Sequence, residues 1–109
     1  MKKYLKIIIQ YLKSKKQHNK KYVFCFWQDA NTNGTWISPD DASNGIPAIC
    51  LSTGWLWKKD NVSTVIVSDL GFDIASDGTS SLNEVGNSTT IPTMNIVKMI
   101  YINVDTKKL

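Results

Sequence analysis

The chain has 109 residues, which fits one domain and is short for two. Its apolar fraction of 42 % and its charged fraction of 20 % are typical of a globular protein and exclude a disordered one. No apolar run is long enough to cross a bilayer as a helix, so a membrane span is excluded as well.

The positive charge is confined to the N-terminal arm. All 13 basic residues are lysines, and eight of them lie in residues 1–21, which contain no acid. Residues 22–109 carry five lysines and nine acids, so this part is mildly acidic. Binding to a nucleic-acid backbone needs clustered positive charge, which only the arm supplies. The absence of arginine also removes the usual bidentate reader of phosphate or guanine.

The two cysteines and the single histidine offer little chemistry. Cys25 and Cys50 each lie in an apolar, strand-like segment and are predicted to be free, buried thiols, although a disulfide stays open. His18 lies in the arm and no C-x-x-C is present, so no metal site and no cofactor are expected. The first 16 residues have the charged-then-apolar order of a signal peptide. Gln10 interrupts their apolar stretch and no small-residue cleavage site follows, so we expect a retained segment and a cytoplasmic protein.

The arm is ambiguous in secondary structure. Leu5, Ile8 and Leu12 have helical spacing, whereas residues 5, 7, 9 and 11 fit a strand. The density of lysine favours an amphipathic helix. It could pack on the body or on a neighbouring subunit, attract a polyanion, or lie on a membrane surface. Residues 17–21 are predicted to be a linker, which divides the chain into an arm at 1–21 and a domain at 22–109.

The first strand is predicted at 22–27, where β-branched and aromatic residues are concentrated. A turn cluster follows at 29–34, and Ser38 is placed to cap a short helical turn that starts at Pro39. The second strand is expected at 48–57, with Gly54 marking a bulge or a sharp bend.

Residues 58–61 form a polar hairpin turn, and 63–70 are predicted to be the third strand, which residues 71–73 extend or bend. We expect 76–88 to be a polar loop and 96–104 to be a closing strand or a short turn plus strand. The pattern predicts a mainly β fold. Its expected form is a small bent-sheet barrel of four to five antiparallel strands, because closure removes exposed edges.

Four short motifs resemble a family of small phage and prophage proteins over residues 22–102, leaving the arm outside. The motifs are Trp27-x-Asp29-Ala30, Gly34-x-Trp36, Ser52-x-Gly54-Trp55-Leu56 and Ile91-Pro92-x-x-x-Ile96. The hairpin at 48–70 and the pair Asn95-Ile96 are more weakly similar to Sm-like and SH3-like barrels. In Sm-like rings the subunits join by edge strands, and RNA bases or nucleotides lie near the loops. The resemblance implies a phage-type binding protein and a homo-oligomer, and fold-level similarity alone does not define function.

The candidate ligand-binding residues combine indoles, lysines and small polar groups: Trp36, Trp57, Lys58, Lys59, Asp29 and Asn95. An exposed indole stacks on a nucleobase or anchors a partner, and a lysine pair contacts an anion. Each has a plainer interpretation. Trp27 is expected in the core, Asp29 can accept backbone N–H groups in its turn, and the two lysines fit a solvated hairpin turn.

No residue set predicts catalysis. Asp40 and Asp41 fit helix-start acids, Ser68-Asp69 has no histidine nearby, and no glycine-rich phosphate loop occurs. The sequence therefore favours a non-enzymatic protein that interferes with host defence or physiology. It would sequester a nucleotide-type small molecule or occlude a host protein. The alternatives are a single-stranded nucleic-acid binder, in which the arm supplies charge, and a structural phage component.

Overall fold

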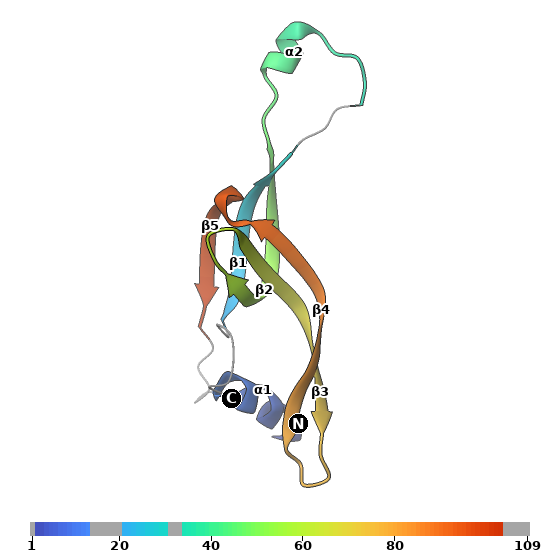
Figure 1. Cartoon of the computed structure of the whole chain (residues 1–109), viewed down its shortest axis with the longest axis vertical. Coiled ribbons are helices and arrows are strands. Elements are labelled where there is room, and N and C mark those ends of the chain that lie inside the picture. Colours follow the sequence, from blue (N-terminus) through green and yellow to red (C-terminus); the bar gives the residue numbers. More distant parts are fainter. Residues whose placement is uncertain (1, 14–20, 31–33, 104–109) are drawn as a thin grey trace.

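The computed structural model describes residues 2–13, 21–30 and 34–103. Its elements in chain order are α1 (Lys2–Lys13), β1 (Tyr22–Asp29), α2 (Pro39–Ser43), β2 (Ala48–Lys59), β3 (Ser63–Ile74), β4 (Ser80–Pro92), the 3₁₀ turn η1 (Thr93–Asn95) and β5 (Ile96–Ile102) (Figure 1). The five strands form one antiparallel sheet in the order β4-β3-β2-β1-β5. The expected mainly β fold with an N-terminal helix is confirmed, and the sheet is open.

Strand β2 changes partner along its length. Residues 48–55 pair with β1 and residues 55–59 pair with β3, so the two pairings overlap at Trp55. Next to this crossover, Gly54 has a φ of 152°, and a Cβ there would lie 2.5 Å from the carbonyl oxygen of Val67. A register shift between Leu56 and Lys58 adds a bulge. The bend that the sequence predicts at Gly54 is thus confirmed.

The β3–β4 hairpin makes the molecule elongated, with extents of 66 × 27 × 23 Å. Figure 1 shows its tip at one end of the long axis and the α2 loop at the other. The expectation of a loop over 76–88 is confirmed for 76–79 and wrong from residue 80 on, because β4 begins at Ser80 and pairs with β3 through Pro92. Ser, Asn and Gly are poor strand formers, but backbone pairing to β3 decides the conformation here. Most side chains of β4 remain in water, so the strand needs little hydrophobicity.

All five strands contribute to one apolar core. Its buried members are Val23, Cys25, Leu56, Ile66 and Ile91, and Trp27, Ile96 and Met99 pack against them. The indole Nε1 of Trp27 donates a hydrogen bond to Ser52 Oγ at 3.0 Å, so its polar atom is satisfied. The predicted core position of Trp27 is confirmed.

Both cysteines are free, as expected, with Cys25 buried and Cys50 half-buried. Burial raises the pKa of the Cys25 thiol, and the charge of Lys59 lowers it by less. The Cys25 thiol therefore stays neutral at pH 7 and acts as a small apolar side chain of the core.

Helix α1 docks on the sheet through Tyr11. The ring of Tyr11 is buried and meets the rings of Trp55 and Phe72 edge-on, at centroid distances of 5.4 and 5.9 Å. Gln10 Oε1 accepts hydrogen bonds from the backbone N–H and the hydroxyl of Ser80. The arm is therefore helical over Lys2–Lys13, and Tyr11 is its most buried residue, whereas the predicted stripe that includes Ile8 is only half-buried.

The turn η1 carries the chain from one edge strand of the sheet to the other. Its Thr93 N–H donates to the carbonyl of Val62 at 3.1 Å, and its hydroxyl donates to the carbonyl of Asp60 at 2.7 Å. The Thr93 and Thr64 hydroxyl oxygens are hydrogen-bonded at 2.9 Å. These contacts fix η1 against the β2–β3 turn, so the ends of β4 and β5 lie close to it.

Asp60 organises the β2–β3 turn and gives a pH prediction. Its Oδ1 accepts hydrogen bonds from the N–H groups of Val62 at 2.9 Å and Ser63 at 2.8 Å, and Lys58 Nζ lies 3.2 Å from its Oδ2. The hydrogen bonds from Ser63 and Val62, followed by that from Lys58, lower its pKa from 3.8 to about 2. Since the folded-state pKa is depressed, the contribution of the carboxylate to stability is present above its ordinary pKa and is lost as the pH falls through about 2.

We expect carboxyl-detected NMR to give a titration midpoint near pH 2 for Asp60. The variant Asp60→Asn assigns the signal, because it removes the titrating group and keeps an oxygen acceptor. A midpoint near 3.8 would contradict the hydrogen bonding described for this turn.

Candidate binding face

Three of the six predicted site residues gather at one turn. Lys58 and Lys59 end β2, and Asn95 lies in η1, which is hydrogen-bonded to the turn that follows Lys59. Lys58 forms an ion pair with Asp60, so its ammonium group is already used inside the turn. This ion pair fits the plainer interpretation, in which the two lysines belong to a solvated hairpin turn.

The other end of β1 leads into the projecting loop that carries α2. Asp29 Oδ1 accepts the N–H of Ala30 at 2.8 Å, a local turn contact. The side chain of Trp36 is fully exposed in this loop. Ser38 Oγ accepts the N–H of Asp41 at 3.1 Å, so the predicted cap of a helix starting at Pro39 is confirmed.

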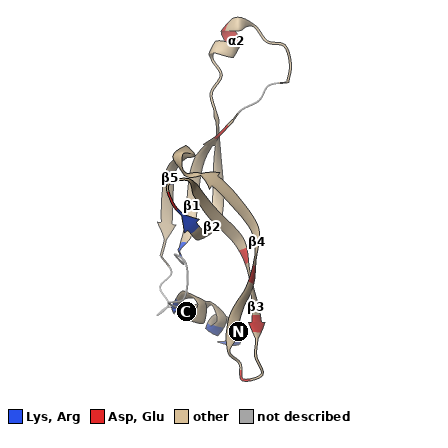
Figure 2. Cartoon of the chain, in the orientation of Figure 1, with Lys and Arg blue, Asp and Glu red and all other residues tan. Residues whose placement is uncertain are grey.

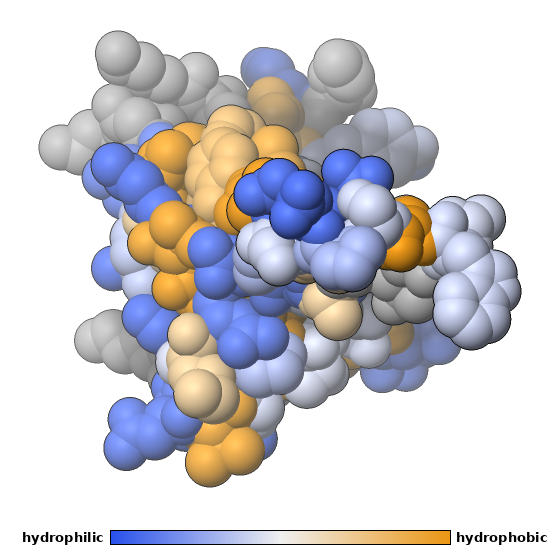
Figure 3. All heavy atoms as spheres, turned by 90° about the horizontal axis from the view of Figure 1, so that it is seen from above, coloured by the Kyte–Doolittle hydropathy of each residue, from blue (hydrophilic) through white to orange (hydrophobic). Residues whose placement is uncertain are grey.

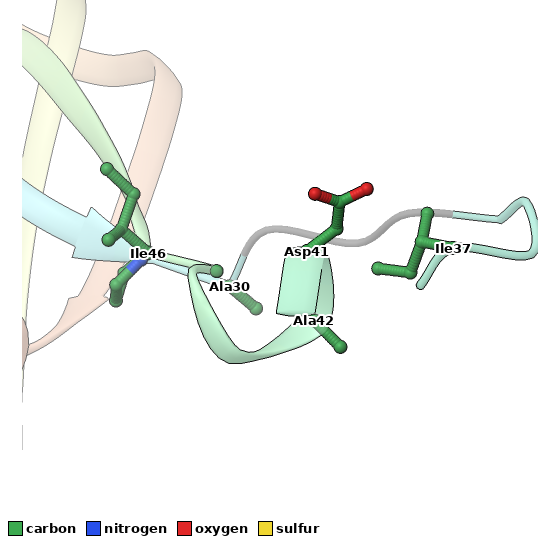
Figure 4. A pocket seen from close by; sticks show the side chains of 7 residues that line it. Ala30, Ile37, Asp41, Ala42 and Ile46 are labelled. Atoms are coloured by element: carbon green, nitrogen blue, oxygen red, sulfur yellow. The ribbon is translucent and has the colours of Figure 1, made fainter. Parts of the chain in front are cut away.

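An open hollow of about 560 Å³ lies beside α2 (Figure 4), lined by Ala30, Ile37, Asp41, Ala42, Gly45, Ile46 and Pro47. Figure 4 shows these side chains spread around α2, with the carboxylate of Asp41 and the methyl group of Ala42 on different sides of it. A small-molecule site needs several polar groups that converge on one point. The hollow beside α2 does not have this arrangement.

Trp57 lines a second hollow, of about 260 Å³, with Leu82, Asn83, Glu84 and Val85 of β4. The charged member is the carboxylate of Glu84, and an adjoining hollow adds that of Asp69. Figure 2 shows acidic residues along the β3–β4 hairpin and lysines on α1. Carboxylates repel phosphate, so the surroundings of Trp57 suit a cationic or neutral group better than a nucleotide.

The sheet carries a larger feature that the candidate list lacks. On β1, Val23 and Cys25 point into the core, so Phe24 and Phe26 point to the opposite side. Strand register places Phe24 beside Ile100 of β5 and Phe26 beside Leu51 of β2. We call this surface the outer face. Its apolar members are Phe24, Phe26, Ile49, Leu51, Ile100 and Ile102, and Thr53 and Lys98 lie on the same side.

The outer face is substantially exposed. Ile49 and Leu51 retain 59 % and 52 % of their accessible surface, and Phe24, Ile100 and Ile102 are also exposed. Seen from above, several apolar residues lie on the left side of the molecule, with hydrophilic residues between them (Figure 3). Contiguous apolar surface of this kind on a folded domain marks an interaction site.

Helix α1 covers the neighbouring end of this side of the sheet. Tyr22 lies opposite both Trp55 and Ile102, and its ring meets that of Trp55 edge-on at 5.4 Å. Tyr11 of α1 then packs on Trp55. The aromatic surface therefore continues from beneath α1 onto the outer face, which is left uncovered in the described part of the chain.

A signal for the outer face was present in the sequence. Residues 22–27 read Tyr-Val-Phe-Cys-Phe-Trp, with no polar residue at the alternate positions. A strand with one face in water normally alternates apolar and polar residues. The absence of this alternation on β1 indicates that the second face of the strand is also covered, either by other parts of the same molecule or by a second molecule.

Comparison of the chain with protein-family models, with curated proteins and with solved structures gave no match. No helix within residues 2–13, 21–30 and 34–103 has the length and apolar content to cross a membrane. The same ranges contain no group of three or more His, Cys, Asp or Glu side chains placed to hold a metal ion.

Proposed function

We propose that this protein is a non-enzymatic binding module whose outer face holds a partner protein. The observation that carries the proposal is the exposure of apolar side chains from three neighbouring strands, with Leu51 and Phe24 near its centre. Interfaces are built around buried apolar and aromatic anchors, and Phe24 and Phe26 supply such anchors on a rigid sheet.

The resemblance of residues 22–102 to small phage proteins makes a host protein the proposed partner. Covering a functional surface of that protein would interfere with host defence or physiology without any reaction. The proposed fold is a small bent barrel of the Sm-like or SH3-like type. A core drawn from all five strands and a three-residue link between the two edge strands support it.

Sequestration of a nucleotide-type molecule is the second version of the same hypothesis. It is less well supported, because Lys58 is paired with Asp60 and Glu84 lies beside Trp57. The lysines of α1 favour a different alternative, which is binding of a single-stranded nucleic acid. Lys2, Lys3 and Lys6 are exposed while Tyr11 anchors the helix. Such a row of charges suits a single-stranded nucleic acid, with an affinity that falls as salt rises.

The test compares wild-type protein with the double variant Ile49→Lys and Leu51→Lys as bait in host-cell extract. We expect a host protein to copurify with the wild type in a fixed ratio and to be lost, by at least about tenfold, with the double variant. Two buried ammonium groups would cost the interface more than the 1.4 kcal/mol that a tenfold loss requires.

The matched control is Val62→Lys, which adds a lysine at an apolar residue that is 79 % exposed, in the β2–β3 turn and outside the outer face. This variant should retain the partner. Capture that survives the double variant would contradict the proposal. So would calorimetric binding of a nucleotide or an oligonucleotide, with no host protein retained.

A further inference from the structure

The two edges of the sheet are built differently. Within the described ranges, β4 pairs with β3 and β5 pairs with β1, so each has one row of backbone N–H and C=O groups directed away from the sheet. Exposed rows of this kind template pairing with another strand, and proteins normally protect them.

Strand β4 carries several protective features. Pro92 lacks a backbone N–H, and Asn87 adopts a left-handed φ of 54° that breaks the regular edge. Glu84 places a charge on the strand, and Gln10 of α1 is hydrogen-bonded to Ser80 at its start. These features disfavour addition of another strand at β4.

Strand β5 has fewer of these features, namely Lys98 and a register shift beside Val97. Its seven residues, Ile-Val-Lys-Met-Ile-Tyr-Ile, include no proline, no glycine and no acid, and Lys98 is its single charge. Exposed apolar side chains flank the edge on both sides of the sheet, since Ile100 lies on the outer face and Tyr101 opposite Val23 on the other. Val97 is 59 % exposed at the start of the strand.

We propose that β5 pairs antiparallel with β5 of a second copy, which joins two five-stranded sheets into one. A two-fold axis through Met99 places Lys98 of each copy opposite Ile100 of the other, so the lysines do not face each other. Next to these pairs Val97 lies opposite Tyr101, which is also apolar, and the regular pairing ends there because the register shift beside Val97 turns Ile96 to the core side. An isologous interface of this kind closes on itself as a dimer.

Pairing also extends the outer face. In this register Ile100 of each copy lies beside Lys98 of the other, and the two outer faces come to lie on the same side of the joined sheet. Strand pairing alone buries little area, and a stable interface needs about 1,000 Å² in total. The exposed side chains of Val97, Tyr101 and Phe24 next to the edge add to the area that the paired strands bury.

Sedimentation equilibrium of the full chain between about 1 and 200 µM tests the dimer. We expect a shift from the 12.3 kDa monomer to twice that mass as the concentration rises. In Ile100→Lys, the new lysine faces Lys98 of the other copy, and we expect the dissociation constant to rise at least about tenfold. In Ile100→Glu, the carboxylate faces the same lysine, and the dimer should be retained or tightened.

The charge comparison keeps the test specific, because both substitutions remove the same apolar side chain from the same position. Val62→Lys serves as a control for added charge, and the near-ultraviolet circular dichroism of each variant reports whether the fold is kept. A monomer over the whole concentration range would overturn the proposal. Equal weakening by Lys and Glu, or growth into rings or longer assemblies, would overturn the two-fold β5 register.

The test of the outer face changes Ile49 and Leu51, both on β2, and measures capture of the partner protein. The dimer test uses Ile100 on β5 and reads mass. Failure of one therefore leaves the outcome of the other unchanged.

Discussion

Replacing Gly54 with alanine is expected to destabilise the protein by about 3 kcal/mol or more, and to prevent folding if the native state is only marginally stable. The new Cβ would lie 2.5 Å from the carbonyl oxygen of Val67 and 2.9 Å from the Cγ2 of Ile66, and the φ of 152° is itself unfavourable for any side chain. The obstructing oxygen belongs to the backbone of β3, so relief requires the two strands to separate.

Two other glycines provide a graded control in urea denaturation. In Gly34→Ala the new Cβ has no neighbouring atom within 4 Å, so the free energy of unfolding should change by less than about 0.5 kcal/mol. Gly78→Ala also meets nothing but has a φ of 87°, so it should cost about 1 kcal/mol from backbone strain alone. If Gly54→Ala were no worse than Gly78→Ala, the close approach of β2 and β3 at this position would be wrong.

Replacing Leu56 with alanine should cost about 2–5 kcal/mol. Leu56 is fully buried and contacts the core cluster that also contains Ile66 and Ile91. Truncation removes apolar contacts and leaves a cavity in a small core, where few other side chains can move to fill it.

The matched comparison is Leu51→Ala on the same strand. Leu51 lies on the outer face and is half exposed, so the same truncation should change the unfolding free energy of the isolated chain by about 0.5 kcal/mol or less. Urea unfolding of both variants at a protein concentration below the dimer transition measures the two values. Similar losses for the two leucines would mean that the outer face is covered within the monomer.

Local chemistry determined much of the architecture. Ser38 and Pro39 specify the start of α2 because a hydroxyl acceptor and a fixed φ act within one helical turn. Gly54 marks the bend because only glycine fits there, and Asp60 defines the β2–β3 turn through hydrogen bonds two and three residues along the chain. Each of these signals acts over a few residues, so it can be read without knowledge of the rest of the fold.

The predictions that the structure corrects concern features that depend on residues far apart in the sequence. β4 forms because β3 offers a long partner, although the segment 80–88 is polar and contains Gly86 and Asn87. Helix α1 docks by Tyr11 because Trp55 and Phe72, far along the chain, form its receiving surface. The same limit applies to the candidate site, because residue type alone points to Trp36, Trp57 and Lys58 and does not show which of them lie together in the fold.

The sequence by itself determined a small, mainly β chain with an indole packed on its core and a bend at Gly54, because composition, alternation and turn chemistry are local properties. For the lysine-rich arm it favoured a helix and left a strand open. Only the tertiary structure decided which apolar residues remain uncovered. The outer face exists because strand pairing brings Phe24, Leu51 and Ile100 side by side on three strands, while the core takes up the alternate positions. Burial is a property of the whole sheet, so the unbroken apolar run on β1 indicates two covered faces and does not show which face belongs to the core.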